Sequence, residues 1–216
     1  MKIAMIGTGN VGQALASTLI RNGHQVTLAG RDAGKTQNVA ASLGARSAAY
    51  PAQAAADADV IVLAVPYDAL LEVGGAIADE AAGKVVIDVT NPGPATEGGA
   101  SAAERLAGTL EGAYVAKAFN TLFGSLMADP SALGTTIDSL FATDSEQART
   151  VLFELIDSIG LRPVDVGPLS SARQMEAMAW LNIQLQLRTG GDWTSTFVLL
   201  HAPAATLHRP ALAMAA

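Results

Sequence analysis

Cysteine is absent from the 216-residue sequence. This absence excludes disulfide bonds, thiolate metal ligands and a cysteine nucleophile. Aromatic residues make up only 5% of the chain and charged residues 15%, and the formal net charge is −7. A protein that binds nucleic acid needs a basic surface to displace counterions from the phosphates. The acidic balance therefore argues against nucleic acid as a partner.

Long hydrophobic runs are also missing, although hydrophobic residues make up half of the chain. The longest apolar run, residues 60–65, is far shorter than the roughly 20 residues that cross a membrane. The apolar segment at residues 1–6 is interrupted at once by Gly7 and Asn10, which is not typical of a secretory signal. We therefore expect a cytoplasmic protein without a membrane span.

The most informative feature that is present is the GxGxxG motif formed by Gly7, Gly9 and Gly12. It follows an apolar segment at residues 3–6 and opens an amphipathic segment at residues 11–22, as in dinucleotide-binding folds. The first glycine permits the tight turn, the second lets the backbone approach a pyrophosphate, and the third lets the helix pack closely. The positive end of the helix dipole then faces the phosphates.

Strand-like hydrophobic segments recur along the chain and alternate with segments of helical periodicity. The strand segments are almost continuously apolar, as expected when helices cover both faces of a sheet. The pattern predicts an α/β fold: a doubly wound, mostly parallel Rossmann sheet with a small C-terminal α/β extension. The expected strands are residues 3–6, 25–29, 59–65, 84–89, 113–119, 139–143 and 162–166. The expected helices are residues 11–22, 35–43, 69–78, 145–159 and a long one from 170 or 171 to about 187. Ser145 is the expected N-cap of the fourth helix and Gly160 its expected stop, and Gly190 and Gly191 are expected to end the last helix.

The corner after the second expected strand selects the nucleotide. An NAD site commonly has an acidic residue there, about 20 residues after the glycine loop, which binds a ribose hydroxyl. Here the corner reads Gly30-Arg31-Asp32, and Lys35 follows. Arg31 can donate two parallel hydrogen bonds to a 2′-phosphate, and Lys35 adds a positive charge one helical turn later. We expect NADP, and NAD bound through Asp32 is the alternative.

These assignments divide the chain into an NADP-binding Rossmann domain at residues 1–121, a C-terminal lobe at 122–200 packed on it, and a tail at 201–216. No internal repeat or low-complexity linker separates the parts. The last helix carries an apolar set that one sheet would not fully cover, namely Met175, Met178, Leu181 and Leu185. This set indicates a homodimer, and burial within the monomer is the alternative.

The ligands of an open α/β sheet lie beyond the carboxyl ends of its strands. Three loops begin there, at residues 65–67, 88–92 and 117–121. Each pairs an apolar or aromatic surface with an amide or hydroxyl group, which suits a nicotinamide ring and a second flat ring. The candidate ligand-binding residues of these loops are Val65, Pro66, Tyr67, Asn91, Ala118 and Asn120.

A general acid or base is not evident in the sequence, and we expect neither a catalytic side chain nor a metal site. Hydride transfer between two organic cofactors needs little acid–base chemistry, because the cofactors carry the reaction. A reductase of a small imine or carbonyl compound would instead need a proton donor such as Tyr67 or Lys117. A third alternative is a noncatalytic NADPH-binding redox regulator.

Several segments of the chain, spanning residue 1 to about residue 200, resemble the NADPH-dependent coenzyme F420 reductases, in which NADP and a reduced 5-deazaflavin exchange a hydride. The matching segments are IGTGNVGQALA, AGRDAGKT, LAVPYDAL, VVIDVTNP, VAKAFNT and LRPVDVGPLSSARQMEAMA. The last segment is the most specific, because it is not a general Rossmann feature. The chain is also similar to the cytosolic reductase part of transmembrane ferric reductases, where a flavin replaces the deazaflavin.

The resemblance implies a role for individual positions. It assigns the pyrophosphate to Thr8, Gly9, Asn10 and Val11, the 2′-phosphate to Arg31 and Lys35, and the nicotinamide side to Val65 and Pro66. Two positions depart from the family pattern: Gly30 stands where a Ser is frequent, and Asn120 where deazaflavin-using members can have His. The expected small-molecule partners are NADP with coenzyme F420 or a flavin, FMN or FAD.

Overall fold

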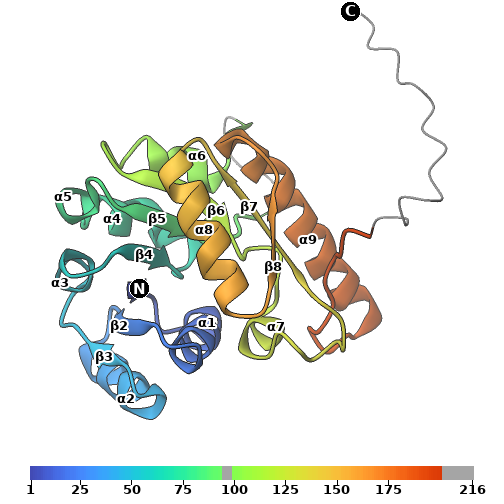
Figure 1. The fold of residues 1–216 in the computed structure, drawn as a ribbon, viewed down its shortest axis with the longest axis horizontal. Coiled ribbons are helices and arrows are strands. Elements are labelled where there is room, and N and C mark those ends of the chain that lie inside the picture. Colours follow the sequence, from blue (N-terminus) through green and yellow to red (C-terminus); the bar gives the residue numbers. More distant parts are fainter. Residues whose placement is uncertain (94–98, 201–216) are drawn as a thin grey trace, which may run out of the picture.

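The computed structural model of the chain describes residues 1–93 and 99–200, which form an α/β structure built on one sheet (Figure 1). Its eight strands, counted over these described residues, lie in the order β3-β2-β1-β4-β5-β6-β7-β8. Neighbouring strands are parallel except β6 and β7, which are antiparallel. The strands are β1 (Lys2–Ile6), β2 (Gln25–Ala29), β3 (Arg46–Ser47), β4 (Val60–Leu63), β5 (Val85–Asp88), β6 (Tyr114–Ala118), β7 (Asp138–Thr143) and β8 (Arg162–Asp165). The expected doubly wound, mostly parallel sheet is confirmed.

Helices cover both faces of this sheet, as right-handed crossovers between parallel strands require. One face is covered by α1 (Asn10–Arg21), α2 (Ala33–Leu43), α7 (Gly124–Ala128) and α8 (Glu146–Ser158). The other is covered by α3 (Pro51–Ala56), α4 (Leu70–Gly75), α5 (Ala78–Ala81), α6 (Ala102–Ala107) and the first turn of α9 (Ala172–Thr189). Short 3-10 turns, η1 (Tyr67–Ala69) and η3 (Leu169–Ser171), lead into α4 and α9. The strands β4 and β5 are buried at every residue, which explains why they are apolar except for Asp88 at the end of β5.

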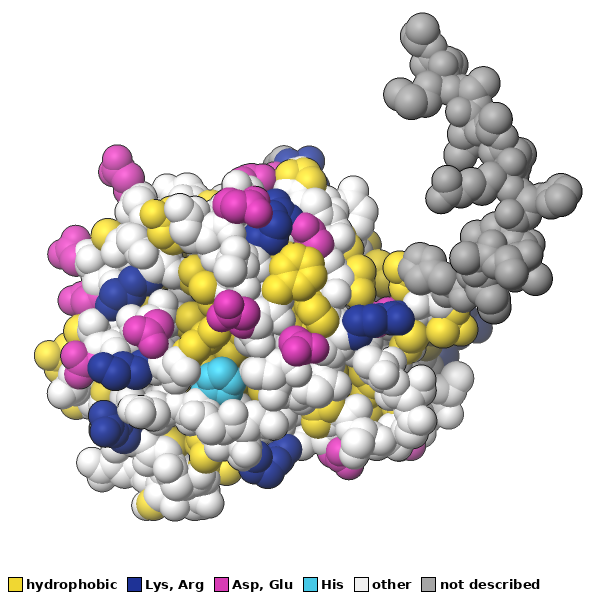
Figure 2. All heavy atoms as spheres, viewed as in Figure 1, with side chains coloured by type: hydrophobic (Ala, Val, Ile, Leu, Met, Phe, Trp, Pro, Cys, Tyr) yellow, Lys and Arg dark blue, Asp and Glu magenta, His cyan; other side chains and the backbone are white. Residues whose placement is uncertain are grey.

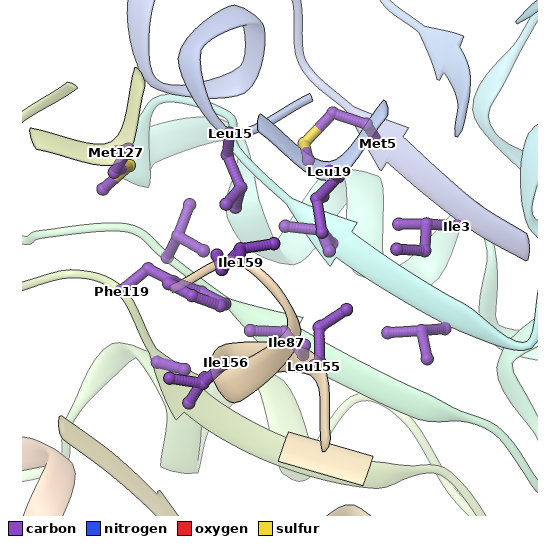
Figure 3. Packing of buried hydrophobic residues seen from close by; sticks show 14 of the residues in the cluster. Ile3, Met5, Leu15, Leu19, Ile87, Phe119, Met127, Leu155, Ile156 and Ile159 are labelled. Carbon is purple, nitrogen blue, oxygen red and sulfur yellow. The ribbon is translucent and has the colours of Figure 1, made fainter. Parts of the chain in front are cut away.

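The larger core cluster lies between the sheet and the helices α1, α7 and α8 (Figure 3). Successive residues of β1 alternate between the two faces, so that Ile3 and Met5 join this cluster while Ala4 and Ile6 join the opposite one. Phe119, which follows β6, is fully buried in the larger cluster. One apolar core on each face therefore holds the carboxyl ends of the strands in place.

The predicted helix ends are confirmed where a cap residue marks them. Ser145 caps α8, because its side chain accepts a hydrogen bond from the backbone N–H of Ala148. Gly160 and Gly190 follow the two long helices with φ angles of 82° and 64°, in the left-handed region that glycine adopts without strain.

Several short elements were not predicted from the sequence. They are β3, α3, α6 and α7, each of two to six residues, which is too short for a periodic pattern to be seen. The helix expected at residues 69–78 is divided instead into η1, α4 and α5. The adjacent Gly74 and Gly75 have low helix propensity and end α4. The last helix starts at Ala172 and runs to Thr189, because η3 takes the positions where it was expected to begin.

The apolar set on α9 is only partly exposed. Met175 is 1% exposed and packs within the monomer, so its predicted place on an uncovered face is wrong. Met178 is half-buried, whereas Leu181 and Leu185 are 51% and 44% exposed. The uncovered part of the set is thus confined to the C-terminal half of α9.

The strands β7 and β8 follow the expected boundary at residue 121 and continue the same sheet. The expected tail at residues 201–216 lies outside the described residues. None of the helices in the described ranges 1–93 and 99–200 is both long and apolar enough to span a bilayer. On the face shown in Figure 2, acidic side chains are interspersed with the Lys and Arg side chains, and the basic side chains do not form a continuous stripe.

Candidate functional site

The glycine loop between β1 and α1 is held by close backbone contacts. Gly7 has a φ of 120°, and a Cβ atom there would lie 2.1 Å from the carbonyl oxygen of Ala64. A Cβ atom on Gly12 would lie 2.1 Å from the carbonyl oxygen of Gly7. Both glycines are therefore required by the packing of this turn. A Cβ atom on Gly9, in contrast, would have no atom within 4 Å, so that the backbone faces open space there.

The first turn of α1 presents its free N–H groups at this open space. Gly9 is the N-cap and provides no side-chain cap, and the first turn contains no acidic residue. The side-chain Nε2 of Gln13 donates a hydrogen bond of 2.8 Å to the backbone carbonyl of Thr8, which fixes the loop. Unpaired N–H groups and the helix dipole favour an anion at such a helix start. The loop thus fits the diphosphate that the sequence predicted.

The corner after β2 leaves its basic side chains unpaired. Arg31 and Lys35 are exposed and form no salt bridge with any other described residue. Asp32 caps α2 instead, because its Oδ1 accepts a 2.9 Å hydrogen bond from the backbone N–H of Lys35. One carboxylate oxygen of Asp32, the acidic residue at this corner, is therefore already hydrogen-bonded within the protein. A Cβ on Gly30 would lie 2.8 Å from Thr36 Oγ1, which shows how tightly the corner is folded.

Asn91 and Asn120 are brought together at the carboxyl ends of β5 and β6. The Nδ2 of Asn91 donates to the backbone carbonyl of Asn120 at 2.8 Å, and the Nδ2 of Asn120 donates to Asn91 Oδ1 at 2.9 Å. Phe119, just before Asn120, has a φ of 62°, which a residue with a side chain rarely adopts. Such strain is found where the surrounding structure fixes a functional conformation.

This amide pair leaves one hydrogen-bond acceptor unsatisfied. The backbone carbonyl of Asn120 requires the Nδ2 of Asn91 to face it, which turns Asn91 Oδ1 toward Asn120 Nδ2. Asn120 Oδ1 is buried and has no partner among the described residues, and the same holds for Thr90 Oγ1. Buried polar atoms normally have a partner, so these two atoms fit a ligand group that would complete them.

The other residues predicted at the carboxyl edge of the sheet differ in how far they are buried. Val65 and Tyr67 pack partly buried against the second core cluster, and Pro66 precedes the turn η1. The side chain of Ala118 is fully buried in the larger core, so its contribution to the edge is its backbone. The structure therefore brings the predicted loops to one edge, with the two asparagines in direct contact.

Of the two residues considered as proton donors, Lys117 has its protons engaged within the protein, whereas Tyr67 accepts a hydrogen bond and keeps its own O–H proton. The hydroxyl oxygen of Tyr67 accepts a 2.7 Å hydrogen bond from Arg105 Nη1. The ammonium of Lys117 is fully buried and donates to Asp88, Glu176 and the carbonyl of Thr90. Its three protons are thus all engaged within the protein.

An aromatic pair beside the site was not predicted from the sequence. Phe123 and Trp193 meet edge to face with ring centroids 5.2 Å apart. Trp193 has a φ of 60°, and its carbonyl accepts a hydrogen bond from the hydroxyl of Ser125. The helix α7 begins after Phe123 and packs along α1, with Gly124 against the backbone of Asn10. A segment after the last helix thus returns to the start of α7, and no periodic pattern in the sequence signals that return.

Comparisons with known proteins agree with this geometry. The family model described as NADP oxidoreductase, coenzyme F420-dependent, matches residues 2–92. The F420-dependent NADP reductase of Methanothermobacter thermautotrophicus is 36% identical over 211 residues, covering 87% of this chain and 90% of that protein. Metalloreductase STEAP3 of Rattus norvegicus is 30% identical over 183 residues, covering 82% of this chain and 36% of that protein. The solved structure of an inferred F420-dependent NADP reductase from Arthrobacter sp. FB24 is similar with a TM-score of 0.83 at 27% identity, covering 93% and 100% of the two chains.

The different surroundings of the glycines give a prediction about stability. Gly12→Ala should lower the free energy of unfolding by about 1–3 kcal/mol, because the new methyl group meets a backbone carbonyl that cannot move aside. Gly9→Ala, the matched control, should cost less than about 1 kcal/mol, because its methyl group enters open space and only the helix cap is weakened. Chemical denaturation of both variants measures the difference. Equal losses of stability would contradict the described packing of the loop.

Proposed function

Because the chain belongs to the F420-dependent NADP reductase family, we propose that it transfers a hydride between NADP(H) and a deazaflavin, coenzyme F420. A flavin is the alternative second substrate. The observation that carries the proposal is the combination of the glycine loop with two exposed, unpaired cations at the neighbouring corner, Arg31 and Lys35. This combination supports an enzyme that binds the 2′-phosphorylated nucleotide.

The binding of NADP(H) follows from the geometry of the loop and the corner. The backbone of Thr8, Gly9, Asn10 and Val11 at the start of α1 receives the diphosphate. Arg31 offers its planar guanidinium to the 2′-phosphate, and Lys35 adds a point charge. The capping role of Asp32 engages one of its oxygens, which favours the phosphate over a ribose hydroxyl.

The nicotinamide and the second ring are assigned to the carboxyl edge of the sheet. Val65, Pro66 and Tyr67 border one side, and Asn91 and Asn120 form the other. When bound, the nicotinamide and the deazaflavin supply the hydride chemistry themselves. The protein orients the rings and excludes water, so that no side chain needs to supply a proton. This division of labour agrees with the state of Lys117, whose ammonium protons are all engaged within the protein.

The activity is tested by an anaerobic assay that follows NADPH formation at 340 nm from reduced F420 and NADP⁺. Reduced FMN and FAD, tested in parallel, distinguish the deazaflavin from a flavin. We expect turnover with reduced F420. Turnover with a flavin alone would correct the second substrate. Absence of turnover with all three donors, in a preparation that binds NADP⁺, would contradict the enzyme and favour a regulator.

The phosphate-binding corner is tested by Arg31→Ala. We expect NADP⁺ affinity to fall by about 1–3 kcal/mol relative to NAD⁺, because a charge-assisted hydrogen bond to the phosphate is lost. Isothermal titration with both nucleotides measures the difference. Arg46→Ala is the matched control, since Arg46 is exposed on the edge strand β3 and lines a different cavity. An equal loss for NAD⁺ and NADP⁺ in Arg31→Ala would refute the assignment.

A homodimer is the proposed assembly. The exposed leucines of α9, Leu181 and Leu185, lie beside the half-buried Met178 and form the apolar strip that a second copy would cover. Sedimentation should give twice the chain mass of 22.0 kDa, and Leu181→Lys combined with Leu185→Lys should give the monomer. If the wild-type protein were a monomer at micromolar concentration, the proposed homodimer would be refuted.

A further inference from the structure

Three charged side chains lie buried directly behind the carboxyl edge of the sheet. Asp88 and Lys117 are partners in the register of β5 and β6, and Glu176 reaches them from α9. The Nζ of Lys117 lies 2.9 Å from Asp88 Oδ2 and 2.9 Å from Glu176 Oε1, and the side chains are 0%, 0% and 7% exposed for Lys117, Asp88 and Glu176. Buried charges of this kind are retained only when they are paired and hydrogen-bonded.

This cluster holds both backbone groups of Thr90. The Oδ1 of Asp88 accepts a 2.8 Å hydrogen bond from the N–H of Thr90. The ammonium of Lys117 donates a 2.5 Å hydrogen bond to the carbonyl of the same residue. Thr90 follows β5 without belonging to it, so no strand pairing fixes this carbonyl. The cluster therefore determines how the chain leaves the sheet.

Asn91 is the next residue after the held carbonyl. Its side chain donates to the backbone of Asn120 and accepts from the Asn120 amide, and Asn120 Oδ1 remains without a partner among the described residues. The peptide that links Thr90 to Asn91 contains the carbonyl that Lys117 holds. A change in this peptide's orientation would move Asn91 and with it the free acceptor of Asn120.

Glu176 compensates the buried cation and ties α9 to the same place. Its Oε1 also accepts a 2.9 Å hydrogen bond from the backbone N–H of Ala102, at the start of α6. Burial raises the pKa of Glu176 above its ordinary value, against the opposing effect of Lys117. A second link between the two helices lies outside the cluster: Arg173 on α9 holds the pKa of Glu104 on α6 at about 2 through a hydrogen-bonded ion pair.

We propose that Lys117 is a positioning residue: its ammonium clamps the carbonyl of Thr90 and thereby pre-organises the Asn91–Asn120 pair for the nicotinamide end of NADP(H). The proposal rests on the proposed function only in placing that ring at the carboxyl edge. Lys117 touches neither ring and moves no proton. Its role is to remove the cost of ordering the loop when the nucleotide binds.

A charge-balanced pair of substitutions tests this role. Lys117→Met combined with Glu176→Gln removes one basic and one acidic side chain, so the formal charge of the cluster is unchanged. The Thr90 carbonyl loses its donor. Glu176→Gln alone is the matched control, because the Lys117 contact with Thr90 remains. Thermal unfolding of each variant establishes that it is folded before binding is measured.

The readout compares NADP⁺ with 2′-phospho-ADP-ribose, which carries the same phosphates but lacks the nicotinamide. We expect the double variant to bind NADP⁺ about 10-fold more weakly than the wild type and to bind the fragment unchanged. The control variant should stay within about 2-fold for both ligands. If the double variant bound both ligands equally more weakly, or bound both as tightly as the wild type, the positioning role would be overturned. A wild type that binds neither ligand would instead count against the proposed function.

Hydrogen exchange in the wild type provides a test that does not depend on the variants folding. If the clamp pre-organises the loop, the backbone N–H of Thr90 exchanges slowly in the free protein, as slowly as the N–H groups of β5. Addition of NADP⁺ should then slow it little further. Rapid exchange of the Thr90 N–H in the free protein, slowed only by NADP⁺, would show that the ligand orders the loop and would refute the proposal.

Discussion

The close approach of two backbone segments at the carboxyl ends of β1 and β4 is the constraint on which the rest of the site depends. Gly7 lies against the carbonyl of Ala64, and Gly12 lies against Gly7, with no room for a Cβ atom at either glycine. This packing directs the start of α1 into the space beside Gly9, where free N–H groups can receive a diphosphate. The basic corner after β2 and the edge loops after β4, β5 and β6 border the path that we propose for the nucleotide.

The two ends of that path are built on different physical principles. At the end proposed for the adenosine, Arg31 and Lys35 are exposed and form no salt bridge with other described residues, so that recognition there rests on charge and the planar guanidinium. At the end proposed for the nicotinamide, the polar groups are buried or half-buried and hydrogen-bonded to one another, from the Lys117 cluster to the Asn91–Asn120 pair. Ordering before binding suits a hydride transfer, because the reaction depends on how the two rings are aligned.

Local sequence signals were sufficient for the fold class, the glycine loop and the helix ends at Ser145, Gly160 and Gly190, since each depends on nearby residues. The roles of Glu176 and Trp193 could not be predicted, because they depend on contacts across the chain: Glu176 meets Lys117 59 residues away, and Trp193 returns to Phe123. Met175 was misplaced for the same reason. The helical pattern identified an apolar stripe on α9 but could not say which part of it the sheet covers.

We propose that the nucleotide follows one continuous path from the Arg31 corner over the glycine loop to the asparagine pair. A crystal structure of the protein with NADP⁺ tests it most directly. We expect the 2′-phosphate within hydrogen-bonding distance of Arg31, the diphosphate on the backbone of residues 8–11, and the nicotinamide carboxamide at Asn120 Oδ1. A nucleotide bound with its adenosine at the asparagine pair, or away from the glycine loop, would contradict it.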